Sequence, residues 1–582
     1  MNEEKLSNIR HSFAHLLAAA VLEIYPDAKR AIGPSIDNGF YYDFEFSKPI
    51  SDSDLKEIEK KMKKMYNSWK GFEKFEVSKE EALKEFAGNE YKIELIEEFS
   101  GEGKTLTVYQ SGEFRDLCGG GHIDDLSKMD MKAFKLSHIA GAYWRGDEKN
   151  LMLTRIYGLA FENVEKLKEY EEKQEEAKKR DHRKIGKELG LFTFSPLVGS
   201  GLPLFTPKGT LLRNLIIERI YSLQSKYGYQ QVWIPHIAKA DLYKTSGHWE
   251  KFGDELFKVK GQGDTEFVMK PMNCPHHTQI YASAPHSYKD LPVRFAEATT
   301  NYRDEQPGEL LGLSRVRSLT QDDGHVFCTH EQIEEEAQKI VDVIRTFYTD
   351  LGLFSKNNYW VSLSVRDPKT PEKYLGDSDV WDRSEKILET VAQNEMLNYK
   401  KVEGEAAFYG PKLDFMFKDA LGREWQLGTV QLDFNMPVRF DLEYTDSKGE
   451  KQHPVMIHRA IAGSLERFLS VIIEHFAGEF PLWLSPVQVK VLPIAETHNE
   501  YAEAVVESLR KSGIRVEIDD SNESFGKKVR NAKVEKVPYF VVIGDEEVKA
   551  MKVTLEGREE KETLDLPNLL EKLQQEGRSK LG

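Results

Sequence analysis

Residues 294–328 read RFAEATTNYRDEQPGELLGLSRVRSLTQDDGHVFC, two runs typical of strands separated by a segment that contains Pro307 and two glycines. The Pro and Gly residues predict a loop, so we expect two strands joined by it. Arg303 and Arg315 stand at the two sides of the loop. A guanidinium can bind phosphate oxygens through two hydrogen bonds, and Glu305 could accept one from an exocyclic amine. The residues by themselves are explained equally well by a hairpin with surface arginines.

Further strand-like runs lie on both sides of this stretch. They are QVWIPHI (231–237), KLDFMFKD (412–419) and EWQLGTVQLDF (424–434). Several follow one another without a helical crossover, which favours an antiparallel sheet flanked by helices over a doubly wound sheet. After them, GSLERF (463–468) places Arg467 on a helix that we expect to begin near Ala462. A helix start that carries an arginine suits a terminal phosphate.

The bulk properties indicate a globular protein of several domains. At about 150 residues per domain, 582 residues predict three or four units. The first residues fit neither a secretory signal nor a transit peptide, and no run approaches the roughly 18 apolar residues of a membrane span. Three cysteines are too few for a disulfide framework. We therefore expect a cytoplasmic protein with no membrane partner. The net charge of −16 does not exclude RNA, because local basic patches bind phosphates.

Composition divides the chain into four parts. Residues 1–160 mix helical patterns with short strands and form the first unit. Residues 161–190, FENVEKLKEYEEKQEEAKKRDHRKIGKELG, are mostly charged and contain no proline, so we expect one long exposed linker helix. Residues 191–484 hold the antiparallel sheet. In residues 485–582 strands and helices alternate, which predicts a small parallel-sheet α/β domain.

The hairpin, GSLERF and IPHI (234–237) together resemble the three signature motifs of class II aminoacyl-tRNA synthetases. The resemblance implies the family's antiparallel sheet, ATP bound across it with Mg²⁺, and the first motif at a homodimer interface. It also implies that Arg303 holds the α-phosphate, Glu305 the adenine, and Arg315 and Arg467 the γ-phosphate. Such charge compensation is what attack of a carboxylate on phosphorus requires.

Three residues point to the amino acid. Cys274 in MKPMNCPHH, His325 in TQDDGHVFC and His458 in MIHRAIAGSLERF share no short metal-binding spacing, and taken singly each is more often an ordinary buried residue. These strings, however, resemble the three zinc ligands of threonyl-tRNA synthetases. The resemblance implies one Zn²⁺ per subunit that binds L-threonine through its amino and hydroxyl groups, so that valine is rejected. It also implies that Asp323 receives the substrate ammonium.

The same resemblance implies further site residues. We expect Lys412 and His248, the latter in SGHWEKF, to act beside Arg303 and Arg467, with His248 near the terminal ribose of tRNA(Thr). The remaining residues expected to bind the amino acid or ATP are Gln321, Tyr409, Gln426, Thr429, Gln431 and Ser464.

Zinc cannot reject serine, because serine also carries an amino group and a hydroxyl, so a correcting site is needed. His11 and His15 lie one helical turn apart, and DLCGGGH places Cys118 and His122 on a glycine loop, with Asp116 nearby. Taken alone, this set reads as a metal site. It also resembles the editing domains of threonyl- and alanyl-tRNA synthetases, which implies hydrolysis of seryl-tRNA(Thr), without a metal in the threonyl family. That family's loop commonly reads CRGPH, and here it reads CGGGH.

The C-terminal region resembles the anticodon-binding domain that threonyl-, prolyl-, glycyl- and histidyl-type synthetases share. The resemblance implies that Asn522, Arg530 and Glu547 read the anticodon, whereas Glu556 stands where a basic residue is customary. Full-length bacterial members usually carry one more N-terminal domain, the ubiquitin-like TGS domain. Because the editing helix here starts almost at Met1, we expect this domain to be lacking.

Three alternatives remain. A synthetase-like RNA-binding regulator would keep the C-terminal domain but lose Arg303, Arg467 or a zinc ligand. A zinc hydrolase would need a general base beside an open metal and no ATP motifs. A prolyl-tRNA synthetase would share the architecture without the set Cys274, His325 and His458. The sequence favours the threonyl family, with tRNA(Thr), L-threonine and ATP as substrates and a homodimer as the assembly.

Overall fold

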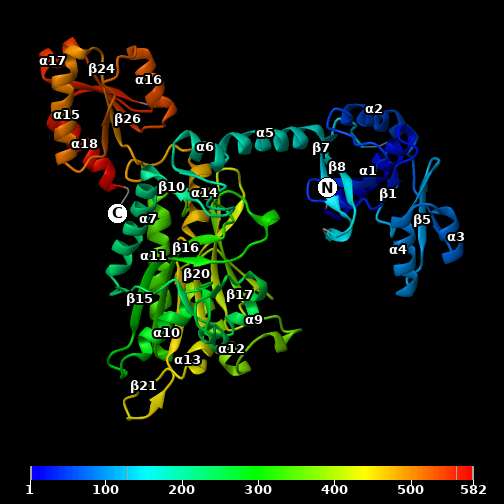
Figure 1. Ribbon diagram of the computed structural model, residues 1–582, viewed down its shortest axis with the longest axis horizontal. Coiled ribbons are helices and arrows are strands. Elements are labelled where there is room, and N and C mark those ends of the chain that lie inside the picture. The colour runs from blue at the N-terminus through cyan, green and yellow to red at the C-terminus, as the bar shows by residue number, and fades with distance from the viewer. Residues whose placement is uncertain (1–2, 127–128, 148, 559, 580–582) are drawn as a thin grey trace. The chain divides into compact units, whose positions relative to one another are not determined.

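The computed structural model describes residues 3–126, 129–147, 149–558 and 560–579. The chain divides into two compact units, Met1–Glu175 and Glu176–Gly582. The boundary falls within helix α5 (Val164–Arg180), which Figure 1 labels. No helix in these described ranges is both long and apolar enough to cross a membrane.

The first unit is built around helix α1 (Glu3–Ile24), which is buried along most of its length. It shares one apolar core with α2 (Leu55–Met65) and a sheet of strand order β1-β3-β8-β7. The strands of that sheet, with β2 paired to β3, are β1 (Lys29–Arg30), β2 (Ser35–Ile36), β3 (Gly39–Glu45), β7 (Phe134–Tyr143) and β8 (Met152–Ala160). Because α1 is buried, polar groups on it need partners inside the unit.

A smaller antiparallel sheet completes the first unit. Its strands are β4 (Glu73–Glu76), β5 (Thr107–Ser111) and β6 (Phe114–Leu117), in the order β4-β5-β6. Helices α3 (Lys79–Glu85) and α4 (Glu90–Gly101) lie between β4 and β5 in the chain. Strand β6 ends one residue before Cys118, so this sheet leads directly into the glycine loop.

The prediction of one continuous helix over residues 161–190 is wrong. Helix α5 ends at Arg180, and a second helix, α6 (His182–Glu188), begins after Asp181. The side chain of Asp181 accepts a hydrogen bond from the backbone N–H of Arg183, which caps α6, and Asp181 itself has a non-helical ψ of 118°. A short acidic side chain that bonds its own backbone competes with helix continuation, which explains the break.

The second unit contains an eight-stranded sheet of order β11-β15-β16-β23-β20-β19-β17-β18. All inner pairs are antiparallel, as expected, and only the two edge pairs are parallel. Figure 1 shows β15, β16 and β20 of this sheet. The strands are β11 (Gln230–Gln231), β15 (Val293–Tyr302), β16 (Ser318–Cys328), β17 (Tyr359–Val365), β18 (Tyr399–Glu403), β19 (Lys412–Lys418), β20 (Glu424–Asp433) and β23 (Val455–Ala460).

Three helices, α7 (Pro207–Ser225), α11 (Ile333–Asp350) and α14 (Leu465–His475), share one large apolar core with this sheet. The register of the central strands then places polar residues from distant parts of the chain side by side. His325 on β16 is directly opposite His458 on β23, and His458 is opposite Gln431 on β20. Sheet pairing, rather than a local motif, therefore assembles the site.

The C-terminal domain has a sheet of order β25-β24-β26-β27-β28, with the first three strands parallel. The prediction of a parallel sheet is wrong for its other half, because β27 and β28 are antiparallel. Only the short helix α17 (Asp545–Ala550) separates β26 from β27, too little chain for a parallel crossover. The strands are β24 (Val489–Pro493), β25 (Val516–Ile518), β26 (Tyr539–Ile543), β27 (Lys552–Glu556) and β28 (Lys561–Asp565), with helices α15 (Asn499–Lys511), α16 (Phe525–Val534) and α18 (Leu566–Ser579).

Candidate functional site

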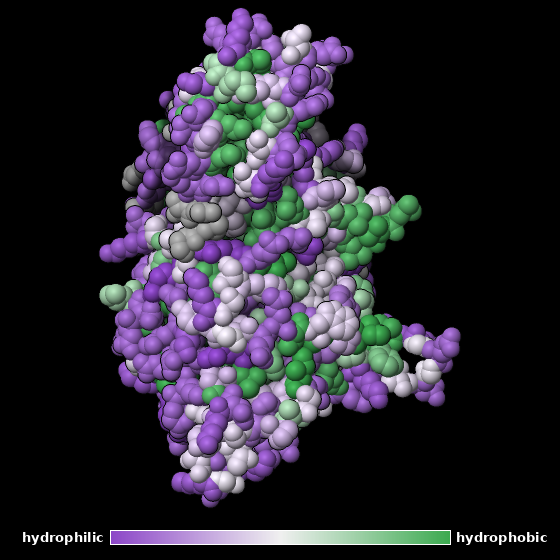
Figure 2. Space-filling view, turned by 90° about the vertical axis from the view of Figure 1, so that its left-hand side faces the viewer, coloured by the Kyte–Doolittle hydropathy of each residue, from purple (hydrophilic) through white to green (hydrophobic). Residues whose placement is uncertain are grey.

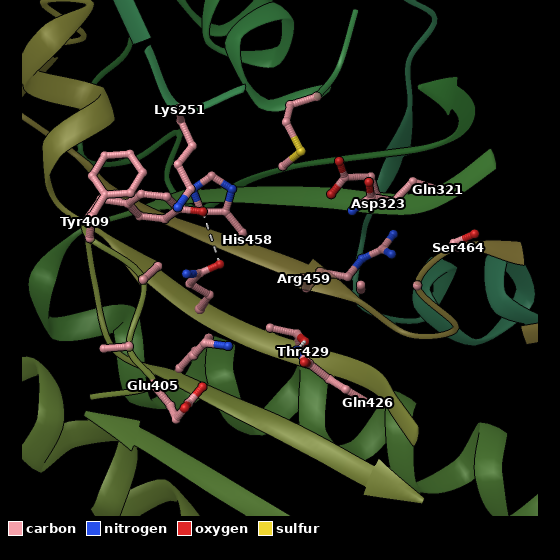
Figure 3. A pocket seen from close by; sticks show the side chains of 18 of the residues that line it. Lys251, Gln321, Asp323, Glu405, Tyr409, Gln426, Thr429, His458, Arg459 and Ser464 are labelled. Carbon is pink, nitrogen blue, oxygen red and sulfur yellow. Dashed lines mark hydrogen bonds between the residues drawn. The ribbon is translucent and has the colours of Figure 1, made fainter. Parts of the chain in front are cut away.

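A cavity of about 720 Å³ is lined by residues of β16, β19, β20, β23 and the start of α14. Figure 3 shows Tyr409 and His458 toward one end of it and Ser464 toward the other. The predicted site residues that line this cavity are His248, Arg303, Gln321, Asp323, Tyr409, Lys412, Gln426, Thr429, Gln431, His458, Ser464 and Arg467. The fold thus brings most of the predicted set together.

Two guanidinium groups in this cavity have no anionic partner among the described residues. Nε of Arg303 is buried without a hydrogen-bond partner, and its guanidinium lies 4.8 Å from the ring centroid of Phe252. Nε of Arg467 donates to the carbonyl of Ser314 at 3.3 Å. Within the described part of the chain, neither arginine forms an ion pair. Burial lowers the pKa of both groups. The Arg303 charge is costly unless compensated, because its Nε is buried without a partner, so the part of the cavity that Arg303 lines suits an anion.

Glu305 and Arg315, both expected to contact ATP, lie on the loop between β15 and β16 and do not line the cavity. They pair with each other instead, since Nε of Arg315 donates to Oε2 of Glu305 at 2.7 Å. Arg315 also lies 3.2 Å from a carboxylate oxygen of Glu309. The two side chains therefore neutralise each other in an ion pair.

Cys274, His325 and His458 are buried, and their ligand atoms all lie within 4.8 Å of one another. Nε2 of His325 is 3.1 Å from Nδ1 of His458. Two nitrogens bound tetrahedrally to zinc at about 2.0–2.1 Å would lie roughly 3.3 Å apart, so the spacing fits a shared metal ion. Burial raises the pKa of the Cys274 thiol. A cation is therefore needed for the thiolate to form there.

The imidazoles of His325 and His458 are each oriented by a second polar side chain. Nε2 of His458 lies 3.0 Å from Oδ2 of Asp433, and Nδ1 of His325 lies 2.7 Å from Nδ1 of His277. Such outer hydrogen bonds leave the other ring nitrogen free for a metal. Asp433 and His277 were missed from the sequence, although QLDF and CPHH contain them.

Asp323 and Tyr409 line the cavity close to the two histidines of the donor set. Asp323 is buried and accepts from Nδ2 of Asn273 at 3.1 Å. Burial raises its pKa. Tyr409 donates to Oε1 of Gln431 at 3.2 Å. A carboxylate beside the three metal-type donors can receive a cationic amine.

Asp414, which was not predicted from the sequence, bonds to three residues that were. Its Oδ1 accepts from Gln426 at 2.7 Å and from Thr429 at 3.0 Å, and its Oδ2 lies 2.5 Å from Nζ of Lys412. The residue is buried, so its charge is held by these neighbours. The signal was present in KLDF, where Asp414 lies on the same face of β19 as Lys412.

His248 and Ser464 both have defined local bonds. Nδ1 of His248 is 2.8 Å from Oγ of Ser246, and its Nε2 is 3.8 Å from Sγ of Cys274. Burial lowers the pKa of His248 to about 4, so the ring is neutral near pH 7. Ser464 caps α14 by accepting from the backbone of Arg467. The helix begins at Leu465, slightly later than predicted.

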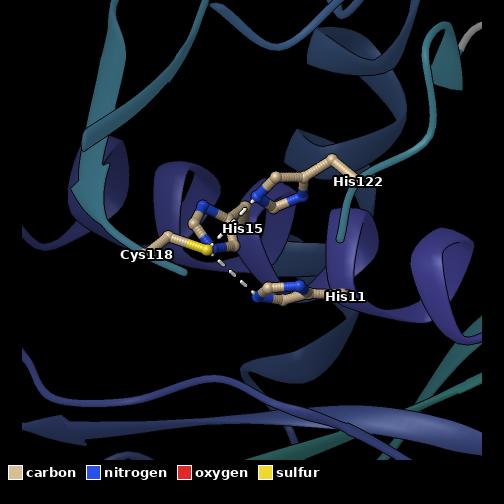
Figure 4. Close-up of side chains that lie close together, drawn as sticks. All are labelled: His11, His15, Cys118 and His122. Carbon is tan, nitrogen blue, oxygen red and sulfur yellow. Dashed lines mark hydrogen bonds between the residues drawn. The ribbon is translucent and has the colours of Figure 1, made fainter. Parts of the chain in front are cut away.

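The first unit holds a second cluster, shown in Figure 4. The ligand atoms of His11 and His15 on α1, and of Cys118 and His122 on the glycine loop, lie within 4.8 Å of one another. Sγ of Cys118 is 3.5 Å from Nε2 of His11 and 3.4 Å from Nε2 of His122. Burial raises the pKa of Cys118 to about 11 and lowers that of His122 to about 3. Neutral imidazoles and a protonated thiol thus face one another.

Asp116 lies beside this cluster but is already paired. Its Oδ1 is 2.8 Å from Nζ of Lys92 and 3.1 Å from Nε of Arg30, and Tyr42 donates to its Oδ2. Burial by itself would raise the pKa of Asp116, but Lys92 and Arg30 outweigh it and hold the pKa well below its usual range. The carboxylate therefore stays ionised and anchored.

In the C-terminal domain, the three predicted anticodon residues differ in their surroundings. Asn522 and Arg530 are exposed, before and on α16. Both carboxylate oxygens of Glu547 are already bonded, one to the backbone N–H of Gly544 at 2.9 Å and one to Oγ1 of Thr554 at 2.7 Å. Glu556 lies 3.5 Å from each of Lys533 and Lys561.

Three family models match separate parts of the chain. Residues 257–476 match the tRNA synthetase class II core domain (G, H, P, S and T). Residues 488–576 match the anticodon binding domain, and residues 106–157 match the threonyl and alanyl tRNA synthetase second additional domain. Cys274, His325 and His458 lie within the core match, and Cys118 and His122 lie within the second-additional-domain match.

Similar proteins cover nearly the whole chain. A threonine–tRNA ligase of Gloeobacter violaceus is 49% identical over 98% of this chain and 92% of its own length. One of Rubrobacter xylanophilus is 48% identical, covering 96% and 86%. The solved RNA binding domain of threonyl-tRNA synthetase from Cryptosporidium parvum Iowa II matches with a TM-score of 0.64, 38% identity, and coverage of 68% of this chain and 98% of that one. The chain therefore belongs to the threonine–tRNA ligase family of class II aminoacyl-tRNA synthetases.

Proposed function

We propose that this chain is an ATP-dependent ligase that joins L-threonine to tRNA(Thr) and hydrolyses mischarged seryl-tRNA(Thr). One observation carries the proposal, in a chain of this family. Two guanidiniums that have no anionic partner among the described residues line the same cavity as His458, one member of a Cys/His/His donor set. A zinc hydrolase would need the donors but not the arginines.

In the first step, the threonine carboxylate attacks the α-phosphorus of ATP, which enters with Mg²⁺, and pyrophosphate leaves. Arg303 stabilises the charge that develops on the α-phosphate, because its unpaired guanidinium faces the cavity. Arg467, at the start of α14, binds the leaving phosphates together with the helix N-terminus. Arg315 exchanges its partner Glu305 for the γ-phosphate, which releases Glu305 for the adenine amine.

Cys274, His325 and His458 would hold Zn²⁺, since one thiolate and two imidazoles leave a position open for substrate. When bound, the ion supplies Lewis acidity that favours an amino acid with both an amine and a hydroxyl. Asp323 accepts a hydrogen bond from the threonine amine, and Tyr409 lines the cavity beside His458. Valine lacks the hydroxyl and is rejected.

The remaining cavity residues orient the reacting groups. Asp414 fixes Lys412, Gln426 and Thr429 in one bonded set, so that the Lys412 ammonium is held at the cavity wall. Gln321, Gln431 and Ser464 offer further polar contacts to ATP or threonine. For transfer to tRNA, His248 is neutral near pH 7 and can accept a proton from the terminal ribose.

Editing is assigned to the cluster of His11, His15, Cys118 and His122 in the first unit. Neutral imidazoles can activate a water against the ester of seryl-tRNA. We favour metal-free hydrolysis, with Asp116 keeping the surrounding charges fixed. The four donor atoms are also close enough to bind a metal, so an experiment has to distinguish a metal-free from a metal-bound editing site.

We also propose that Asn522, Arg530 and Glu547 lie at the anticodon surface and that the protein works as a homodimer in the cytoplasm. Trp233 and Ile237, in the segment expected at the dimer interface, are 76% and 45% exposed. Large exposed apolar side chains favour a protein interface. Figure 2 shows one face of the molecule on which hydrophobic residues lie in separate groups among hydrophilic ones. All three cysteines are free, which suits a reducing compartment.

Charging assays test the proposal. Purified protein, ATP–Mg²⁺ and a tRNA(Thr) transcript should yield threonyl-tRNA, and preformed seryl-tRNA(Thr) should be deacylated faster than threonyl-tRNA(Thr). If the protein forms no threonyl-tRNA from a tRNA(Thr) transcript that a known threonine ligase can charge, the ligase assignment is contradicted. That result would favour an RNA-binding regulator. Retained charging without deacylation would contradict the editing assignment alone.

A further inference from the structure

His182, the first residue of α6, links three segments of the second unit. The side chain is buried, with 3% of its surface exposed. Its Nδ1 lies 2.6 Å from Oε1 of Glu474 on α14, and its backbone N–H donates to the same oxygen at 3.1 Å. Its Nε2 accepts from the backbone N–H of Leu313 at 3.0 Å. Because a carboxylate accepts and an N–H donates, the ring carries its proton on Nδ1.

This cluster is not a free metal site. Ligand atoms of Asp181, His182 and Glu474 lie close enough to share an ion, but each already has partners. Asp181 accepts from Arg183, and Glu474 pairs with Arg423 as well as with His182. The imidazole therefore acts as a hydrogen-bonded bridge within the protein.

The bridge ends on a tight turn in the loop between β15 and β16. Leu311 N donates to Arg315 O at 3.1 Å, which closes the turn around Leu313. Gly312, just before Leu313 in the turn, has a φ of +51°, and a Cβ there would lie 2.2 Å from Nε2 of His182. The imidazole thus packs on the turn backbone as well as bonding to it.

The same turn holds both arginines assigned to the γ-phosphate. The carbonyl of Ser314 accepts from Nε of Arg467, and Oγ of Ser314 is 2.9 Å from Oγ of Ser470. Arg315 closes the turn and pairs with Glu305. A shift of Leu313 would therefore displace Arg315 and Arg467 together.

We propose that His182 is a positioning residue for ATP. It does not line the cavity and acts through Leu313, whose N–H its Nε2 holds. Glu474 keeps the proton on Nδ1, so that Nε2 remains an acceptor. This inference rests on the proposed function, since it concerns the placement of the phosphate-binding turn in the ATP-dependent step.

Two conservative substitutions test the bond from His182 to Glu474 and the bond from His182 to Leu313 one at a time. In His182→Gln the amide reaches the place of Nε2 and can still accept from Leu313. In His182→Asn the amide occupies the place of Nδ1 and can bond to Glu474 but not to Leu313. Each variant loses one bond, so a purely structural role would lower the unfolding midpoint of both and leave their ATP KM values alike.

The readout is threonine-dependent ATP–pyrophosphate exchange by the full-length protein. We expect His182→Asn to raise the ATP KM about tenfold, the effect of one hydrogen bond, with the threonine KM unchanged. His182→Gln should restore the ATP KM to within about threefold of wild type. A matched control is His498→Gln, since His498 also accepts a backbone N–H and bonds a carboxylate, but in the C-terminal domain. It should leave exchange unaltered.

A further variant guards against misfolding of His182→Asn. Gly312→Ala places a methyl against Nε2 of His182 and should raise the ATP KM in the same way. Folded Gly312→Ala with a wild-type ATP KM would overturn the inference, as would equal ATP KM values for His182→Asn and His182→Gln. Absence of exchange in the wild-type protein would instead refute the proposed function, whatever the variants do.

Discussion

Nε2 of His458 lies 3.0 Å from Oδ2 of Asp433, while Nδ1 of the same ring faces Nε2 of His325 at 3.1 Å. The carboxylate keeps the ring proton on Nε2, so the lone pair of Nδ1 points toward the other proposed ligands. Both residues are buried, which fixes the ring in this orientation. The bond to Asp433 therefore sets the ring orientation in which His458 would bind a metal.

Asp433→Asn should weaken zinc binding about 10- to 100-fold. Oδ1 of Asp433 accepts from the backbone of Asn435 and Met436, so the amide nitrogen of the variant would face Nε2 of His458 and favour the wrong tautomer. Competition with a chromogenic chelator measures the affinity. Asp419→Asn is the matched control, because Asp419 also bonds backbone N–H groups but lies outside the donor set. Equal affinities in wild type and Asp433→Asn would exclude this role.

Arg459→Met should destabilise the sheet by about 3 to 5 kcal/mol, the cost of leaving one partner of a buried pair unpaired. Nη1 of Arg459 lies 2.6 Å from Oδ1 of Asp322, and both side chains are almost fully buried. Amide hydrogen exchange of β16 and β23 peptides measures the loss. Replacing Asp322 by Asn in the same chain should recover part of it. Unchanged exchange in Arg459→Met would show that the pair adds nothing.

The first unit should lose stability as pH falls below about 6.5, the ordinary pKa of histidine. Burial lowers the pKa of His11, His15 and His122, the last to about 3. The unfolded chain therefore takes up protons first, and stability is full above pH 6.5 and lost progressively toward pH 3. Amide exchange of α1 between pH 7 and 5 tests this. Replacing His122 by Gln should reduce the slope by about one proton, and an unaltered slope would contradict the assignment.

Cys118 should react slowly with thiol reagents. Burial raises its pKa to about 11, so at pH 8 only about one thiol in a thousand is ionised. Alkylation followed by mass spectrometry should show a rate that keeps rising tenfold per pH unit up to pH 10. Added Zn²⁺ should leave the rate unaltered if editing is metal-free. Protection by Zn²⁺, abolished in His15→Gln, would show that the four donors bind the metal.

Parts of the fold could be predicted because they depend on local chemistry. The Pro/Gly loop in residues 294–328 marked the two strands that the structure has as β15 and β16. The antiparallel sheet followed from strands without crossovers. The break at Asp181 could not be foreseen from charge patterning, because it comes from one side-chain cap, the hydrogen bond that Asp181 accepts from the backbone N–H of Arg183.

The site was recognisable only in part, because strand pairing over long distances in the chain brings its residues together. His325 and His458 are 133 residues apart, and only the pairing of β16 with β23 places them opposite each other. Their spacing gave no metal signature, and a family resemblance had to supply it. Asp433 and His277 act through contacts with His458 and His325, which no local pattern reveals. Asp414 differs, because it bonds within the β19–β20 pair and its place beside Lys412 in KLDF was a local signal.

ATP–pyrophosphate exchange with threonine, serine and valine, on metal-replete and chelator-treated protein, measures both the amino-acid specificity and its dependence on zinc. We expect strong exchange with threonine, weak exchange with serine and none with valine, all lost with the chelator and restored by Zn²⁺. Absence of exchange with threonine, or equal exchange with valine, would contradict this expectation.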